Sequence, residues 1–215
     1  MNQPNGAELA TTPPLSTGVR LHYVERGDPR AEAIVFLHGY SDSWFSFSWV
    51  LPLLSPSYHA FALTQRGHGD SDKPECCYTL DDFAADVDAF MDVVGLEAAT
   101  IVGASTGALF AQRMALSYPR RVSRLVMIGA QSPANEAVMG LVEEIRALED
   151  PVPPEFVRGF QESTTYQLVP PEFLDTVVSE SLKLPARYGA TIWRGRCFLS
   201  TRIMCSRFVR SMCRR

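Results

Sequence analysis

Four short stretches of almost uninterrupted apolar residues recur along the first 130 positions. They are AIVFLHG (33–39), YHAFALTQ (58–65), ATIVGAS (99–105) and VSRLVMIGA (122–130). Runs of this length bounded by turn-forming residues are typical of strands that are buried on both faces. An earlier stretch, GVRLHYVERGD (18–28), alternates apolar and polar residues before a Gly-Asp turn, which predicts a further strand.

Helical periodicity separates these predicted strands. Residues 79–95 begin with Thr79 as an N-cap, carry apolar residues at helical spacing and stop at a glycine. A second helix is predicted from residue 106 up to a proline, and the aromatic stretch at 44–54 predicts a loop that leads into a helix. Because strands alternate with helices, we expect an α/β fold, with a mostly parallel sheet and helices on both of its faces.

The pattern changes after residue 129, where apolar positions recur at helical spacing between pairs of prolines. Three amphipathic helices are predicted, over residues 134–148, 154–162 and 170–184. No further strand–helix unit follows them. The pattern therefore predicts a core over residues 1–132 whose last strands are missing, and a partial helical cap over residues 133–186.

The distribution of charge sets residues 187–215 apart as a basic tail of unrelated character. All 24 acidic residues lie at or before Glu180, whereas eight arginines and no acid follow from Arg187 onward. One hypothesis is that a reading-frame change or truncation replaced the original C-terminal part of the protein. The alternative is a basic arm that binds nucleic acid or an anionic membrane. The arginines are interspersed with Cys, Phe, Met and Ile, which favours the first hypothesis, so no nucleic-acid partner is expected.

Composition narrows the class of protein further. With 46% hydrophobic residues in 215, the chain can bury a substantial core. No apolar run is long enough for a membrane span, and the polar N-terminus lacks the features of a secretory signal, so a cytoplasmic protein is expected. The five cysteines form no C-x-x-C pair and no cluster with histidines, which predicts free thiols and no metal site; they are Cys76, Cys77, Cys197, Cys205 and Cys213.

The sequence Gly103-Ala104-Ser105-Thr106-Gly107 lies where a predicted buried strand meets a predicted helix. Flanking glycines permit a tight turn there, because side chains at their positions would collide with neighbouring strands. The helix N-terminus directs N–H groups and a positive dipole towards Ser105, which suits a developing oxyanion. The arrangement predicts a nucleophilic serine; the alternative is a serine that only caps the helix.

These motifs together resemble the α/β-hydrolase superfamily, in particular its lipase/esterase-like and dehalogenase-like members with a helical cap. The resemblance covers roughly residues 18–185 and is carried by FLHGYSDSW, ALTQRGHGDSDKP, TLDDFAADVDAFMDVVGL, VGASTGALFAQRMALSYP and VSRLVMIGA. It implies that Ser105 is the nucleophile and that the backbone N–H groups of Tyr40 and Thr106 form the oxyanion hole. It also implies a cofactor-free, metal-free hydrolase whose substrate pocket is shaped by the cap.

The residue at the nucleophile position and three departures from the family pattern bear on function. A serine at position 105 argues against haloalkane dehalogenase or epoxide hydrolase chemistry, since those relatives carry an aspartate there. Ala104 and Gln65 also differ from the usual residues, but neither is expected to be catalytic. The third departure is the missing base: the family order is serine, acid, histidine, whereas all the histidines of this chain precede Ser105.

Structural roles are expected for those histidines, which are His22, His38, His59 and His68, with His22 exposed. Glu136 could stand where some members keep their acid, but a glutamate at a helix start is the preferred interpretation. The leading hypothesis is a serine hydrolase of an ester or similar small acyl compound, impaired by the missing histidine. The alternatives are a non-catalytic remnant or ligand-binding protein of the same fold, and an interaction protein that uses the basic tail.

Overall fold

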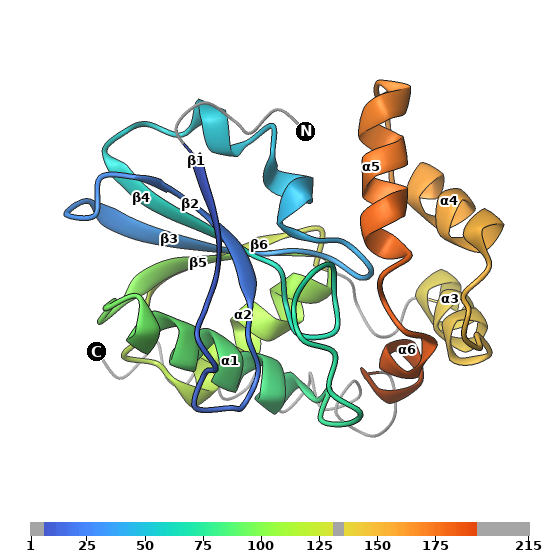
Figure 1. Cartoon of the computed structure of the whole chain (residues 1–215), viewed down its shortest axis with the longest axis horizontal. Coiled ribbons are helices and arrows are strands. Elements are labelled where there is room, and N and C mark those ends of the chain that lie inside the picture. The colour runs from blue at the N-terminus through green and yellow to red at the C-terminus, as the bar shows by residue number, and fades with distance from the viewer. Residues whose placement is uncertain (1–6, 131–135, 193–215) are drawn as a thin grey trace.

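The computed structural model describes residues 7–130 and 136–192, in which six strands form one sheet in the order β1-β2-β4-β3-β5-β6 (Figure 1). The strands are β1 (Ala7–Thr11), β2 (His22–Gly27), β3 (Glu32–Leu37), β4 (Tyr58–Leu63), β5 (Ala99–Ala104) and β6 (Val122–Ile128). Strands β4, β3, β5 and β6 run parallel, while β1 and β2 add an antiparallel edge. The expected mostly parallel α/β sheet is confirmed; β1 was not anticipated.

The side chains of β3 alternate between two apolar cores, which explains the uninterrupted apolar run in its sequence. Val35 and Leu37 belong to the core on one face of the sheet, and Ile34 and Phe36 to the core on the other. All four are buried. A strand that is covered on both faces has no polar side, so period-2 alternation disappears from its sequence.

Helices α1 (Leu80–Val93) and α2 (Thr106–Ser117) lie together below the sheet in Figure 1. Apolar residues of both helices belong to the core on that face. The other core includes residues of two short 3-10 helices, η1 (Trp44–Phe47) and η2 (Leu51–Leu53), where a loop and a longer helix were expected. The N-cap prediction for α1 is confirmed, because Asp82 N–H donates to Thr79 Oγ1 while Asp82 Oδ2 accepts from Thr79 N–H.

Helices α3 (Glu136–Arg146), α4 (Pro154–Ser163) and α5 (Pro171–Ser181) match the three predicted cap helices and lie to one side of the sheet in Figure 1. Both α4 and α5 begin with proline, whose fixed φ suits the first helical turn. A fourth helix, α6 (Ala186–Ile192), was not predicted and crosses the expected boundary at residue 187. Its Tyr188 is fully buried, whereas residues 193–215 lie outside the described part of the chain.

Strand β6 forms one edge of the sheet, and its apolar side chains are exposed. The exposed fractions are 42% for Val126, 45% for Met127 and 53% for Ile128. Side chains on successive positions of a strand point to opposite faces, so β6 is poorly covered on both. Among the described residues, β6 is therefore an apolar strand at an uncovered edge of the sheet.

The expectation of free thiols is wrong for the two cysteines that the structure describes. Cys76 and Cys77, neighbours in the chain, form a disulfide, and Cys77 adopts a left-handed backbone conformation with φ 71°. A search for spaced cysteine pairs overlooks a bond between neighbours in a tight turn. The other three cysteines lie outside the described residues.

Within the described ranges, none of the helices combines the length and apolar character needed to cross a bilayer.

Candidate active site

Ser105 occupies the sharp turn between β5 and α2, as predicted. Its backbone adopts φ 52° and ψ −117°, a conformation that side-chain-bearing residues rarely adopt. Hydrogen bonds hold the turn on both sides: Ser105 N–H donates to the carbonyl of Ile128 at 2.9 Å, and the Ser105 carbonyl accepts from Ala108 at 3.0 Å. Ser105 is exposed in this strained turn.

The two flanking glycines are required by close approaches of the backbone. A Cβ at Gly107 would overlap the carbonyl oxygen of Leu37 on the neighbouring strand β3. A Cβ at Gly103 would overlap the backbone of Gly107 and Ala108 at the start of α2. These contacts agree with the steric reason for which the sequence predicted a tight strand-to-helix turn.

The segment that follows β3 lies directly against the serine. A Cβ built on Gly39 would be 3.2 Å from the Cβ of Ser105, so the chain passes close to Ser105 at this point. Tyr40 is the next residue, and Thr106 is the first residue of α2. Within the described residues, no group accepts a hydrogen bond from the backbone N–H of either one. The fold thus brings together the three residues selected from the sequence.

His38 fixes this segment by using both of its ring nitrogens. Nδ1 is 2.8 Å from the carbonyl oxygen of Gly39, and Nε2 accepts from the backbone N–H of Gln65 at 3.0 Å. The Gln65 side chain donates in turn to the His38 carbonyl at 3.0 Å. Complete burial lowers the pKa of His38 to about 4, so the ring is neutral near pH 7. The predicted structural role of His38 is confirmed, and Gln65 acts as its partner.

His68 is buried behind His38, with ring centroids 4.8 Å apart. Its Nδ1 lies 2.9 Å from the carbonyl oxygen of Arg66, and its ring packs edge-on against Tyr188 at 4.6 Å. Burial, followed by the neighbouring His38, holds the pKa of His68 well below its usual value. A ring in this setting supports packing, as expected.

The remaining two histidines lie on β2 and β4, each beside a carboxylate. His59 on β4 is 2.7 Å from Glu25 Oε1 on β2. His22 was expected to be exposed, but only 12% of its side chain is exposed, and it lies 3.8 Å from Asp70. Burial lowers the pKa of His22 despite that carboxylate. The exposure prediction is wrong because the turn after β4 covers this end of β2: Ser71 Oγ accepts from His22 N–H.

Asp42, which sequence analysis did not select, lies beside Gly39, as Ser105 does. Its Oδ2 is 3.0 Å from the position that a Gly39 Cβ would occupy. The carboxyl accepts hydrogen bonds from the side chains of Gln161 and Ser46 and from the Gly39 backbone. Burial nevertheless raises the pKa of Asp42 to about 6. The one available signal was an acidic residue four positions after His38.

Gln161 on α4 connects the cap to this loop. Its buried Nε2 lies 3.0 Å from Asp42 Oδ1, 3.2 Å from Ser41 Oγ and 2.9 Å from Ser181 Oγ on α5. A buried amide with several partners fixes its neighbours, because losing any one bond leaves a polar group unsatisfied. The cap is therefore hydrogen-bonded to the loop that borders Ser105.

The aromatic stretch after Asp42 serves packing more than a pocket. Phe47 is buried against Phe36, with ring centroids 5.0 Å apart. Trp49 and Phe45 pack on Phe173 of α5, with centroids 4.1 and 5.2 Å apart. These rings join the core to the cap.

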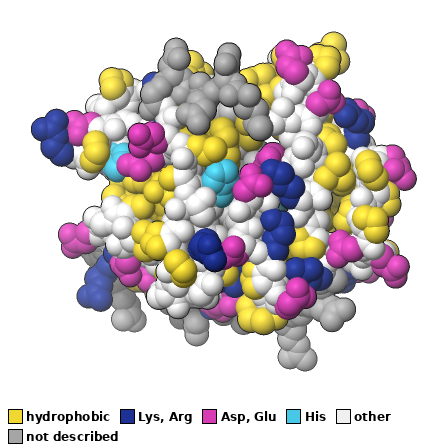
Figure 2. All heavy atoms as spheres, viewed as in Figure 1, with side chains coloured by type: hydrophobic (Ala, Val, Ile, Leu, Met, Phe, Trp, Pro, Cys, Tyr) yellow, Lys and Arg dark blue, Asp and Glu magenta, His cyan; other side chains and the backbone are white. Residues whose placement is uncertain are grey.

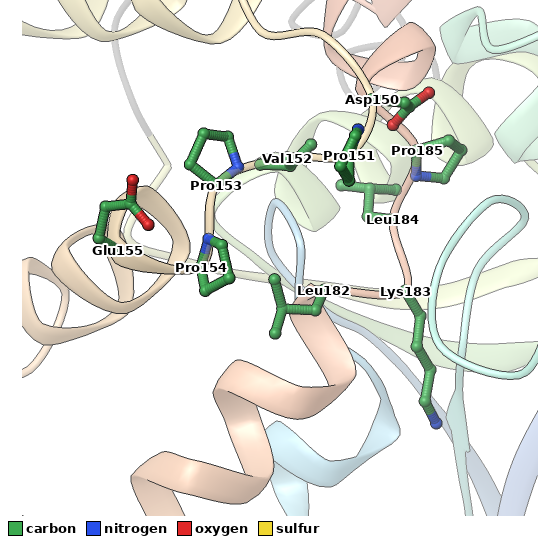
Figure 3. Close-up of a pocket in the computed structure, with 10 residues that line it drawn as sticks. All are labelled: Asp150, Pro151, Val152, Pro153, Pro154, Glu155, Leu182, Lys183, Leu184 and Pro185. Atoms are coloured by element: carbon green, nitrogen blue, oxygen red, sulfur yellow. The ribbon is translucent and has the colours of Figure 1, made fainter.

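A pocket of about 850 Å³ opens between the segments that lead into and out of the α4–α5 pair (Figure 3). Residues 150–155 line one side and residues 182–185 the other. Figure 3 shows several prolines in its wall and the Lys183 side chain pointing away from them. None of the lining residues belongs to the Ser105 turn or the Gly39 segment, so this pocket is separate from the candidate nucleophile.

On the face shown in Figure 2, acidic and basic side chains are interspersed, without an extended field of one sign. Among the described residues, no group of three or more His, Cys, Asp or Glu side chains could hold a metal ion. Glu136, the residue considered for the catalytic acid, is the first residue of α3. Its side chain lies outside the described part of the structure.

A family model described as the alpha/beta hydrolase fold matches residues 32–164. Among curated proteins, epoxide hydrolase A of Mycobacterium tuberculosis is 33% identical over 131 residues, covering 57% of this chain and 41% of the relative. Epoxide hydrolase 3 of Mus musculus is 32% identical over 138 residues, which cover 63% of this chain and 36% of the relative. The matches thus span well under half the length of these relatives.

Solved structures give the same fold over most of the chain. Epoxide hydrolase A from Mycobacterium thermoresistibile superposes with a TM-score of 0.75 at 20% identity, covering 93% of this chain and 78% of that one. An esterase from a Rhodococcus species superposes with a TM-score of 0.70 at 25% identity, covering 86% of this chain and 72% of the esterase. Epoxide hydrolases and esterases both occur among the similar structures.

Proposed function

The chain belongs to the alpha/beta hydrolase fold family, and from that premise we propose that it hydrolyses an ester or similar small acyl compound through Ser105. The observation that carries this proposal is the backbone conformation of Ser105. An exposed serine with φ 52°, between two glycines that admit no side chain, has no evident packing role. Strain of this kind is maintained at functional positions.

The surrounding backbone supports the stabilisation of a tetrahedral intermediate. Ser105 Oγ attacks the acyl carbon, and the negative charge that develops on the carbonyl oxygen is held by the N–H groups of Tyr40 and Thr106. The N-terminal end of α2 adds the positive end of its dipole. Loss of one such donor in related chemistry lowers kcat by about 100- to 1000-fold.

Epoxide hydrolysis is the second candidate, favoured by the names of the curated relatives at 30–33% identity. The family resemblance assigns an aspartate to the nucleophile position in such enzymes, and this chain has Ser105 there. Attack of Ser105 Oγ on an epoxide carbon would open the ring to a hydroxy ether, which water does not readily hydrolyse. The acyl substrate therefore fits the residue better.

The proposal is tested with p-nitrophenyl butyrate and styrene oxide as parallel substrates. We expect release of p-nitrophenol that is abolished in Ser105→Ala, with no diol formed from the epoxide. Turnover of the ester that persists in Ser105→Ala would contradict the proposal. Saturable binding of the ester without turnover would favour the alternative of a non-catalytic ligand-binding protein.

A further inference from the structure

Asp42 and Ser105 both approach the same point beside Gly39, a residue without a side chain. The Asp42 Oδ2 and the Ser105 Cβ lie 3.0 Å and 3.2 Å from one point, the position of a Cβ on Gly39. The two atoms are therefore no more than about 6 Å apart. Ser105 Oγ is bonded to that Cβ and Ser105 is exposed, so one water with hydrogen bonds of about 2.8 Å to each group can connect the hydroxyl to the carboxylate.

The histidines do not compete for this role. His38, the nearest in sequence, has both ring nitrogens engaged by the Gly39 carbonyl and the Gln65 N–H. His68 is buried behind it, and His22 and His59 lie beside carboxylates at β2 and β4. No histidine follows Ser105 in the 215 residues.

We propose that the Asp42 carboxylate is the general base that activates Ser105, in place of a histidine. This inference rests on the proposed ester hydrolysis and identifies the group that accepts the proton. As Ser105 Oγ bonds to the acyl carbon, its proton passes through the bridging water to Asp42. The intermediate collapses, the bond to the alcohol breaks, and the proton is transferred to the leaving oxygen.

The second half of the reaction uses the same carboxylate. Water attacks the acyl-serine carbon and gives its proton to Asp42. The bond between the acyl carbon and Ser105 Oγ then breaks, and Ser105 recovers a proton from Asp42. The carboxylic acid is released, and both residues return to their starting states, so no oxidant, metal or further reactant is needed.

The surroundings of Asp42 suit a base that works near neutral pH. Burial raises its pKa to about 6, and the hydrogen bonds from Gln161, Ser46 and Gly39 oppose that rise. These facing groups from α4 and from its own loop are uncharged, as is Ser105. On α5, the acid Glu180 is paired with Lys183 at 2.7 Å instead. A general base is most effective when its pKa lies near the working pH.

The adjoining titratable side chain, Tyr40, does not disturb this arrangement. Burial raises the pKa of Tyr40 above its ordinary value, so its hydroxyl stays neutral over the working range. The ring packs against Phe160 of α4 and Tyr188 of α6, with centroids 5.4 and 5.8 Å apart. The charge state of the loop beside Ser105 therefore depends on Asp42.

The test uses diethyl p-nitrophenyl phosphate, which reacts once with an activated serine and releases p-nitrophenol. The second-order rate of this release is measured from pH 5 to 9. We expect the wild-type rate to rise with pH through a midpoint near 6. Asp42→Asn should be slower by about 100-fold or more and should lose the midpoint. Asp175→Asn, a carboxyl on α5 paired with Arg158, is the matched control and should behave as wild type.

A second variant keeps the test decisive if Asp42→Asn fails to fold. Gln161→Leu removes a hydrogen bond that lowers the pKa of Asp42, so the midpoint should move to higher pH. An unmoved midpoint in Gln161→Leu, or no midpoint between pH 5 and 7 in the wild type, overturns the role of Asp42. A slower Asp42→Asn that keeps the wild-type midpoint also overturns it, because another group would then be the base.

The Ser105→Ala variant separates failure of this inference from failure of the proposed function. Labelling that persists in Ser105→Ala, or no labelling of the wild type, overturns the serine mechanism itself. Labelling that depends on Ser105 but is unaffected by Asp42→Asn overturns the role of Asp42 alone.

Discussion

Arg66 and Asp86 form a two-point ion pair in the interior of the protein. The Nε–Oδ2 and Nη2–Oδ1 distances are both 2.5 Å, and each side chain is less than 5% exposed, at 4% and 3%. Asp86 also accepts from Thr17 Oγ1, and Arg66 donates to the Cys77 carbonyl. The pair ties the turn after β4 to helix α1, with the groups on both sides hydrogen-bonded.

Asp86→Asn should lower the free energy of unfolding by about 3–5 kcal/mol, because it leaves the guanidinium of Arg66 buried beside a neutral amide. Urea unfolding measures the change. Asp81→Asn on the exposed side of α1 breaks an ion pair with Arg113 and serves as the control, with an expected loss of less than about 1 kcal/mol. Equal losses in the two variants would contradict the importance of burial.

Ser105→Gly should raise the free energy of unfolding by about 1 kcal/mol while abolishing acyl transfer. Glycine adopts φ 52° with little strain, and the relief outweighs the extra freedom it gains in the unfolded chain. Ser105→Ala retains the Cβ and should leave stability near wild type. Thermal and urea unfolding of the two variants check the prediction, and equal stabilities would argue against strain at this residue.

Gly107→Ala should destabilise the protein by more than about 3 kcal/mol, because its Cβ would overlap the Leu37 carbonyl on β3. Gly159→Ala on α4 is the matched control, since a Cβ there meets nothing within 4 Å. Alanine favours a helix interior, so this control should be more stable by about 0.5–1 kcal/mol. Urea unfolding should therefore give shifts of opposite sign.

Lowering the pH from 6.5 towards 4 should destabilise the fold through its buried histidines. The unfolded chain binds protons near pH 6.5, whereas His38 in the folded protein stays neutral down to about pH 4, so acid favours unfolding. Asp42 acts in the opposite direction, because its pKa is higher in the folded protein, at about 6. The fall in melting temperature between pH 6.5 and 4.5 should therefore be steeper in Asp42→Asn. A shallower fall would contradict the raised pKa of Asp42.

Met127→Lys should reduce association at high protein concentration, because it places a charge on the exposed apolar edge strand β6. Light scattering against concentration measures the effect. Leu53→Lys provides a control at a more exposed apolar residue outside the sheet. If both variants reduce association equally, general solubility and not the strand edge would be responsible.

The sequence predicted the central strands and α1 well because burial on both faces and a complete capping box leave strong local patterns. It missed β1, whose five residues include only short or exposed apolar side chains, and α6, which lies at the start of the region dominated by arginine. The buried Tyr188 of α6 is fixed by contacts with Tyr40 and His68, which are distant in sequence.

At the candidate site, too, features set by local sequence could be predicted and features set by distant contacts could not. Ser105 and its glycines follow from a local steric rule, so their geometry could be predicted. Asp42 could not, because its position depends on Gln161, which approaches from a helix 119 residues later in the chain. The setting of His38 likewise depends on Gln65, on the turn after the next strand.

The segment before α4 and the segment after α5 are hydrogen-bonded to each other. Asp150 Oδ1 accepts from the backbone N–H of Ala186 at 2.8 Å, which closes the chain on itself across 36 positions. Segments with adjoining ends tolerate insertion and deletion, because a change of length within them does not move the points of attachment. Changes of length within residues 151–185 should therefore leave both ends of the segment in place, provided that Gln161 keeps its contact with Asp42 beside Ser105.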